Sequence, residues 1–238
     1  MNQNNGLMGR RRFLTLTGTG GMALGAAVMG SAFWSMQSDQ AIAASLESPS
    51  PDAALKRLLD GNQRFVTQKS KHPDQLRSRI KEVAQAQHPF ATVLSCADSR
   101  VTPEILFDEG IGDLFDIRVA GNIVTPEVLG SIEYAVALLG TPLIMVLGHE
   151  RCGAVTAAVS EEHLPGHISS FVKAIKPAIP KTKDESIDLI DEAVTANVQY
   201  QIQKLKQNST IVSQQLLDGK LKIVGGRYDL DTGEVKLI

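Results

Sequence analysis

The sequence predicts an α/β fold, with a mainly parallel central β-sheet flanked by helices and a helical N-terminal arm. Two patterns in the 238 residues predict it. Short apolar runs without polar alternation recur along the chain, as expected for strands covered on both faces. Between these runs lie longer segments whose apolar residues repeat every three or four positions, as in amphipathic helices. Strands that alternate with helices favour a parallel sheet with helices on both faces.

The expected helices are marked by apolar spacing or by capping residues. Leu55, Leu58 and Phe65 share one side of the first helix, and Thr125 with Pro126 opens the third as N-cap and first helical residue. The helices are expected over residues 51–68, 74–87, 125–140, 152–160 and 186–206. The expected strands are 90–95, 114–120 and 142–148, followed by a strand, a turn and a closing strand over 221–238.

The first 43 residues resemble an export signal of the twin-arginine type. Arginines at 10–12 precede a weakly apolar segment at 14–33 and a small-x-small site that ends at Ala43. The resemblance implies the twin-arginine translocase as a partner during export, and the periplasm or a thylakoid lumen as the destination. An uncleaved membrane anchor is the alternative, since about 20 apolar residues can span a bilayer. Residues 44–51 are interpreted as a linker and 52–238 as the folded domain.

Composition excludes several classes of function. The formal net charge of −2 gives no general attraction to nucleic acid, so no nucleic-acid partner is expected. Two cysteines are too few for a disulfide scaffold. Their positions in the chain therefore carry more information than their number.

Both cysteines follow buried strands. Cys96 stands directly after the strand 90–95, and His149 and Cys152 stand directly after the strand 142–148. Ligands of open parallel sheets bind beyond the carboxyl ends of the strands, so we expect these three residues to meet at one edge. A spacing of three would place His149 and Cys152 on one side of a first helical turn. Spacings of two would point Cys96, Asp98 and Arg100 the same way in an extended segment.

Two thiolates and one imidazole form a ligand set that suits zinc. Three protein ligands leave a fourth position open for water, which is the mark of a catalytic zinc site, where the pKa of bound water falls to about 7. Two alternatives stay open. Cys96 and Cys152 could form a disulfide in an oxidising compartment, or Asp98 could be the fourth ligand of a structural zinc.

The stretches "CADSR" (96–100) and "GHERCGA" (148–154) resemble the β-class carbonic anhydrases of bacterial and cyanobacterial type. Further matching stretches are "GNQRF" (61–65), "RVAGN" (118–122) and "GGRYDLDTGEV" (225–235), so the resemblance covers most of 52–238. It implies reversible hydration of CO₂ to bicarbonate and a proton through a zinc-bound hydroxide. It also implies a homodimer or homotetramer in which the CO₂ pocket is shared between subunits.

The same resemblance assigns roles to individual residues. It implies one Zn²⁺ per chain held by Cys96, His149 and Cys152, with Asp98 and Arg100 as the catalytic dyad and no other cofactor. Arg100 carries a permanent charge and a rigid fork, which suits it to hold Asp98 and keep it ionised. The rival functions are a zinc hydrolase of a related triatomic molecule such as CS₂ and a non-catalytic zinc-binding protein.

One departure from the family bears on regulation. Some members close their zinc with the aspartate and respond to bicarbonate at a second site. That control resembles a pattern with a tryptophan three residues before the first cysteine and an arginine about twenty residues after it. Arg118 matches the arginine, but Val93 stands at the tryptophan position. The sequence therefore predicts the open form, with Asp98 paired to Arg100. Asp108 and Glu109 could form an acid pair, but a solvated turn is the preferred interpretation.

Overall fold

The structure is a computed structural model that describes residues 48–160, 164–179 and 188–238. The expected signal, 1–43, and the first part of the expected linker lie outside these residues. Within the described ranges, no helix combines the length and apolar character needed to cross a membrane.

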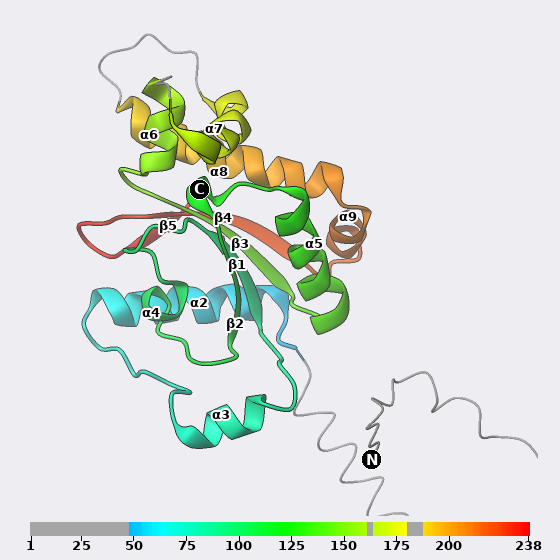
Figure 1. The fold of residues 1–238 in the computed structure, drawn as a ribbon. Coiled ribbons are helices and arrows are strands. Elements are labelled where there is room, and N and C mark those ends of the chain that lie inside the picture. Colours follow the sequence, from blue (N-terminus) through cyan, green and yellow to red (C-terminus); the bar gives the residue numbers. More distant parts are fainter. Residues whose placement is uncertain (1–47, 161–163, 180–187) are drawn as a thin grey trace, which may run out of the picture. The chain divides into compact units, whose positions relative to one another are not determined.

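A five-stranded sheet forms the centre of the fold, with the spatial order β2-β1-β3-β4-β5 (Figure 1). Every neighbouring pair is parallel except β4 and β5, which are antiparallel. The predicted fold class is confirmed. The strands are β1 (Ala91–Ser95), β2 (Leu114–Arg118), β3 (Leu143–His149), β4 (Lys222–Tyr228) and β5 (Val235–Leu237).

The register of the central strands positions the later site. Ser95, the last residue of β1, lies opposite Leu147 of β3 and Arg118 of β2. His149, the last residue of β3, lies opposite Tyr228 of β4. Because β1 and β3 are parallel neighbours, the segments that leave their carboxyl ends start side by side. Every residue of these two strands is buried, which is why their sequences show no polar alternation.

Several helices begin and end close to the expected residues. Ser50 caps the first by accepting a hydrogen bond from the Ala53 N–H, and Asp188 caps the long helix by accepting from Ile190 and Asp191. Gly140 ends the middle helix in the left-handed conformation. These helices are α2 (Pro51–Val66), α5 (Pro126–Tyr134) with the π-helical turn η3 (Ala135–Leu139), α6 (Gly153–Ser160) and α8 (Leu189–Asn208).

Other helices differ from the expectation. The helix predicted over 74–87 is reduced to α3 (Arg77–Val83), which buries none of its residues, so no core contact extends it. Three short α-helices lie in segments for which the sequence predicted no helix. They are α4 (Pro103–Leu106), α7 (Ser169–Ile175) and α9 (Thr210–Leu217).

Hydrophobic clusters cover both faces of the sheet. On one face, Leu58 of α2 packs with Val93 of β1 and Leu147 of β3. On the other face, Leu94 of β1 packs with side chains of α5, α8 and α9, among them Val198. A third cluster, which includes Cys96 and Cys152, lies where α6, α7 and α8 meet the carboxyl ends of the strands. Figure 1 shows α2 on the opposite side of the sheet from α8.

Asp108 and Glu109 do not lie in a solvated turn, and that interpretation was wrong. Both are buried beneath α2. Arg57 binds the Glu109 carboxylate through two nitrogens, and Arg64 contacts Asp108 at 2.5 Å. The two arginines lie more than 40 positions earlier in the chain, so local sequence gives no sign that these carboxylates are paired.

Candidate metal centre

Cys96, His149 and Cys152 come together at the carboxyl ends of β1 and β3. One ligand atom from each lies within 4.8 Å of the others, and all three residues are buried. The two sulfur atoms are 3.9 Å apart. The expectation that these residues meet at one edge of the sheet thus agrees with the geometry. Both cysteines are free, so the alternative disulfide is not formed in this structure.

The His149 ring is oriented with one nitrogen facing the sulfur atoms. Its Nδ1 lies 2.8 Å from the carbonyl oxygen of Glu150, a contact in which Nδ1 carries the proton and donates. Its Nε2 is therefore an acceptor, and it is buried without a hydrogen-bond partner. A buried acceptor that faces two thiols is costly unless something binds it. A metal ion fits these donors, since a neutral imidazole and two sulfur atoms are ligands that zinc prefers.

The two thiols share a proton unequally. The hydrogen bond from the Cys152 thiol lowers the pKa of Cys96 to about 4, and the Gly121 N–H adds a weaker hydrogen bond at 3.4 Å. The pKa of Cys152 is raised, because Cys152 donates to the Cys96 sulfur and is buried. Cys96 is therefore the thiolate of the pair. A cation that replaces the shared proton would bind both sulfurs as thiolates.

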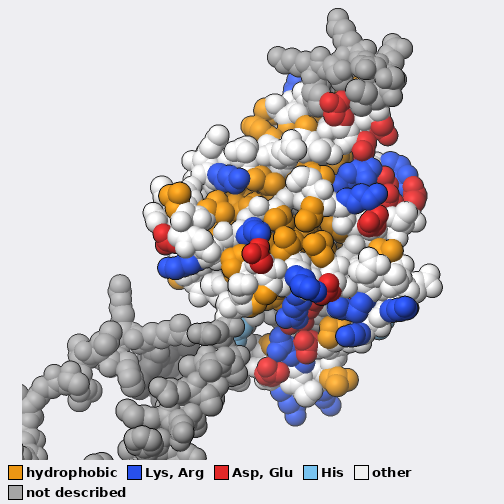
Figure 2. All heavy atoms as spheres, turned by 180° about the vertical axis from the view of Figure 1, so that it is seen from behind, with side chains coloured by type: hydrophobic (Ala, Val, Ile, Leu, Met, Phe, Trp, Pro, Cys, Tyr) orange, Lys and Arg blue, Asp and Glu red, His pale blue; other side chains and the backbone are white. Residues whose placement is uncertain are grey.

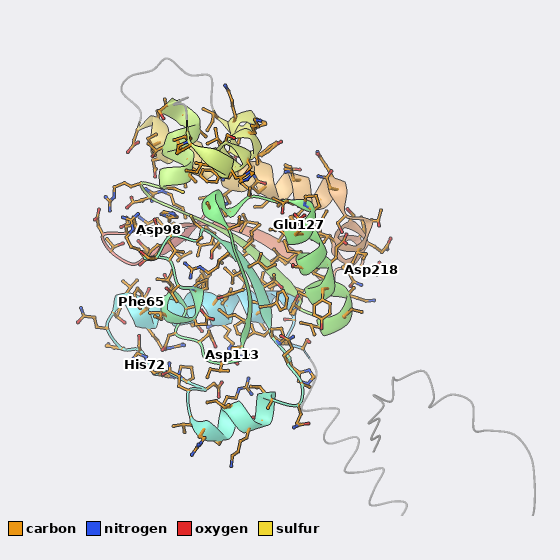
Figure 3. All side chains as sticks on the ribbon, viewed as in Figure 1. Phe65, His72, Asp98, Asp113, Glu127 and Asp218 are labelled. Atoms are coloured by element: carbon orange, nitrogen blue, oxygen red, sulfur yellow. The ribbon has the colours of Figure 1, made fainter. Side chains whose placement is uncertain are left out.

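Asp98, which is labelled in Figure 3, lies beside this cluster and is held by Arg100. The guanidinium contacts both carboxylate oxygens, Nε to Oδ1 at 2.9 Å and a terminal nitrogen to Oδ2 at 2.8 Å. These hydrogen bonds lower the pKa of Asp98 well below its ordinary value, so the carboxylate stays ionised. Asp98 Oδ2 is 3.8 Å from His149 Nε2, close enough to reach a group bound there.

The backbone of both segments differs from the expectation. Cys96, Asp98 and Arg100 do not lie in an extended segment, because the Arg100 N–H turns back to donate to Asp98 Oδ1 at 3.0 Å. Likewise, His149 and Cys152 do not share a helical turn. His149 ends β3, the chain reverses through Arg151 with φ of +49°, and α6 begins only after Cys152. The spacing predicted the meeting of the side chains but not the turns that produce it.

Arg118, which the sequence matched only to the family's regulatory pattern, supports the first segment. Its guanidinium donates to the carbonyl oxygens of Cys96 at 3.3 Å and of Asp98 at 2.6 Å. It therefore holds the backbone that carries one sulfur and the dyad carboxylate. Arg118 ends β2, the strand that follows β1 in the sequence, and lies opposite Ser95 in the register; this position at the end of the neighbouring strand is the signal that could have found it.

The second segment is held by the C-terminal hairpin of β4 and β5. Arg227 of β4 contacts Glu150 at 2.6 Å, and Arg151 binds both carboxylate oxygens of Asp231 at 2.8 and 2.9 Å. Glu150, Asp229 and Asp231 also lie close enough together to hold a cation. Arg227 and Arg151 already compensate two of these carboxylates, so the acidic group is explained by the ion pairs that join this segment to the C-terminal hairpin.

Comparison with known proteins agrees with the site. A family model described as carbonic anhydrase matches residues 91–235. A carbonic anhydrase of Mycolicibacterium smegmatis is 43% identical over 196 residues, which cover 81% of this chain and 95% of that protein. The chain belongs to the β-class carbonic anhydrase family. Carbonic anhydrase 2 of Mycobacterium tuberculosis is 40% identical with the same coverage.

Solved structures of β-carbonic anhydrases share the fold. The structure of the β-carbonic anhydrase CcaA aligns with a TM-score of 0.62 and 28% identity, covering 77% of this chain and 94% of that one. The predicted family and enzyme class are confirmed. Membership makes this chain an enzyme of the carbonic anhydrase class, whose reaction is the hydration of CO₂.

Proposed function

We propose that this β-carbonic anhydrase hydrates CO₂ reversibly to bicarbonate and a proton with one zinc ion per chain, held by Cys96, His149 and Cys152. The observation that carries the zinc assignment is His149 Nε2, a buried acceptor without a hydrogen-bond partner that faces two sulfur atoms 3.9 Å apart. When bound, zinc would supply a Lewis acid with one open position and lower the pKa of a water there.

Asp98 and Arg100 have separate tasks in this proposal. Asp98 is an ionised acceptor, so it would accept a hydrogen bond from the attacking water and direct the water's remaining lone pair at the carbon of CO₂. Arg100 acts through Asp98, because its two donors occupy both carboxylate oxygens and keep the carboxylate in place.

The pairing of Asp98 with Arg100 supports the open form of the site. In the closed form, Asp98 would leave Arg100 and occupy the open position itself. Val93 is buried in β1 and offers no indole to form a bicarbonate pocket. Arg118 is already engaged by the carbonyl groups of Cys96 and Asp98. We therefore propose that bicarbonate competes with CO₂ only at the metal.

A homodimer or homotetramer is proposed as the assembly. Strand β2 pairs only with β1 among the described strands, so one edge of the sheet is open. Large apolar side chains near this edge are exposed, including Ile105, Tyr134 and Leu138. Figure 2 shows hydrophobic side chains gathered in the middle of one face, with most charged side chains around them. Sedimentation of the purified protein at several concentrations tests this, and a monomer at micromolar concentration would contradict it.

The function is tested by measuring zinc content and CO₂ hydration on the same preparation. We expect about one zinc per chain, rapid CO₂ hydration by stopped flow, loss of activity with the metal on chelation, and recovery when zinc is restored. Zinc without CO₂ hydration would favour a non-catalytic zinc protein. Hydrolysis of CS₂ without CO₂ hydration would favour the rival enzyme.

We also propose that residues 1–43 direct export through the twin-arginine translocase, followed by cleavage after Ala43. The paired arginines ahead of Phe13 and Leu14 support this proposal. A variant with Arg10→Lys and Arg11→Lys keeps the charge and should remain in the cytosol. Fractionation of cells expressing each form is the measurement, and unchanged export of the double variant would rule out this route.

A further inference from the structure

A hydrogen-bonded chain leads from helix α8 to the sulfur of Cys96. The Gly121 N–H points at Cys96 Sγ at 3.4 Å. The carbonyl oxygen of Gly121 accepts a hydrogen bond from Asn197 Nδ2 at 2.9 Å. Behind Asn197, Gln201 donates to Asn197 Oδ1 at 2.9 Å and accepts from the Val124 N–H at 2.9 Å. Two side chains one turn apart on α8 thus hold both ends of the segment 121–124.

The conformation of Gly121 explains why this segment needs to be held. Gly121 has φ of +71° and lies in the short helix η2 (Ala120–Asn122). A Cβ at this position would come within 2.5 Å of Ile175 Cδ1, so the site requires glycine both for its dihedral angle and for space. Glycine has the widest choice of backbone conformations. The N–H and the carbonyl group of Gly121 lie in two peptide planes joined by its φ and ψ, so a hydrogen bond that fixes the carbonyl restricts the directions open to the N–H.

Asn197 and Gln201 are both completely buried, where an amide is costly unless its hydrogen bonds are made. Apolar residues would fill this part of α8 at lower cost, since the helix here packs against Gly148 through Val194 and Val198. The amides instead reach a segment 76 and 77 positions away that carries a donor to a metal ligand. Neither residue has a part in the reaction described above.

We propose that Asn197, supported by Gln201, is a positioning residue for the metal centre that holds the Gly121 N–H on the sulfur of Cys96. The inference rests on the proposed zinc site. An N–H donor withdraws electron density from a ligating thiolate, and such contacts behind metal ligands tune both affinity and reactivity. Loss of Asn197 should therefore make Cys96 a stronger electron donor and a less well ordered ligand.

The test replaces zinc with Co²⁺, whose sulfur-to-metal charge-transfer band reports the electron density on the thiolates. Asn197→Leu removes both hydrogen bonds and keeps the branching and the number of side-chain heavy atoms, with methyl groups in place of the amide. We expect the band to move to lower energy, and CO₂ hydration by the zinc form to fall by about tenfold or more. An unshifted band in folded Asn197→Leu protein would overturn the inference.

Asn62 provides a matched control. It is another buried asparagine that grips distant backbone, donating to the carbonyl groups of Leu106 and Gly233 and accepting from the Val235 N–H. Asn62→Leu should lower thermal stability without moving the charge-transfer band. An equal shift in both variants would mean that the band reports general loosening, and the inference would fail.

A second variant covers the case in which Asn197→Leu does not fold. Gln201→Met leaves the Asn197 donor in place but removes its support, so a smaller shift in the same direction is expected. No shift in Gln201→Met would then overturn the inference. If wild-type protein with Co²⁺ shows no sulfur charge-transfer band at all, the proposed metal site itself is wrong.

Discussion

The two segments that carry the proposed ligands are held in different ways. The segment after β1, residues 96–100, is held by hydrogen bonds to its backbone and its sulfur, which come from Arg118 and Gly121. The segment after β3, residues 149–152, is held by ion pairs between its side chains and the C-terminal hairpin. One ligand therefore depends on donors from a neighbouring strand and loop, whereas the segment of the other two is tied to the hairpin by ion pairs and by the hydrogen bond from the Glu150 N–H to the carbonyl oxygen of Tyr228.

The contacts that hold the two segments also differ in their exposure to solvent. The side chains of Arg151 and Asp231 are 57% and 71% exposed, so water and salt screen their attraction. Gly121 is buried, and its hydrogen bond to the Cys96 sulfur is shielded from solvent. The buried Gly121 contact should therefore matter more than the outer pair on the second segment, which should be dispensable. Arg118 is itself exposed, but it binds the carbonyl groups of Cys96 and Asp98 and so holds the backbone directly. Four predictions break or sharpen this comparison.

The largest effect is expected from loss of a ligand, which should not depend on the segment. Cys152→Ser and Cys96→Ser each replace a thiolate with a hydroxyl that zinc binds poorly, so both should lose most of the metal. Metal analysis of purified protein is the measurement. Full zinc retention in Cys152→Ser would contradict the ligand assignment.

Changing the dyad should lower activity while the metal stays bound. Asp98→Asn keeps the shape of the side chain but removes the charge that orients the attacking water, and we expect CO₂ hydration to fall by about a hundredfold or more. Arg100→Ala frees Asp98 to reach the open position and should impair the enzyme by a different route. Stopped-flow rates alongside zinc content separate these effects from ligand loss. Zinc loss in Asp98→Asn would show that Asp98 is itself a ligand.

The pH dependence of the wild-type enzyme follows from the same dyad. Arg100 depresses the pKa of Asp98, so Asp98 contributes stability above the ordinary aspartate pKa of about 3.9, and that contribution is lost only as pH falls below this value. Between pH 6 and 9 Asp98 therefore does not titrate. Activity should rise with pH through one ionisation, that of the attacking water. A steep, cooperative loss of activity below neutral pH would show that the closed form operates.

Much of this arrangement could be predicted from the sequence because parallel strands end at a common edge. The apolar runs before Cys96 and His149 identified two strands, and the parallel sheet then required their ends to be close. The short helices α4, α7 and α9 were missed, since a few residues leave no periodic pattern.

The supports of the site could not be predicted in the same way. Asn197 reaches Gly121 across 76 positions, and Arg57 reaches Glu109 across 52, so neither contact has a local signature. The turn at Arg151, where φ is positive, is likewise held by the ion pair between Arg151 and Asp231 of the C-terminal hairpin, 80 positions away. Spacing in the sequence found the residues that would touch a metal, while the residues that place them are determined by the tertiary structure.

The smallest effect is expected from Asp231→Asn, and its comparison with Arg118→Met tests the two kinds of support against each other. Asp231→Asn removes the charge that pairs with Arg151 but keeps the shape of the side chain, and Arg118→Met removes the donors to Cys96 and Asp98 while keeping an apolar stem. We expect Arg118→Met to lower CO₂ hydration by about tenfold with zinc retained. Asp231→Asn should change the rate little, because an exposed ion pair contributes little and salt already weakens it. Salt screens the same ion pair, so raising the salt concentration should lower the wild-type rate of CO₂ hydration by no more than Asp231→Asn does. If Asp231→Asn proves as damaging as Arg118→Met, the exposed ion pair fixes the ligands of the second segment as firmly as the hydrogen bonds from Arg118 fix the first.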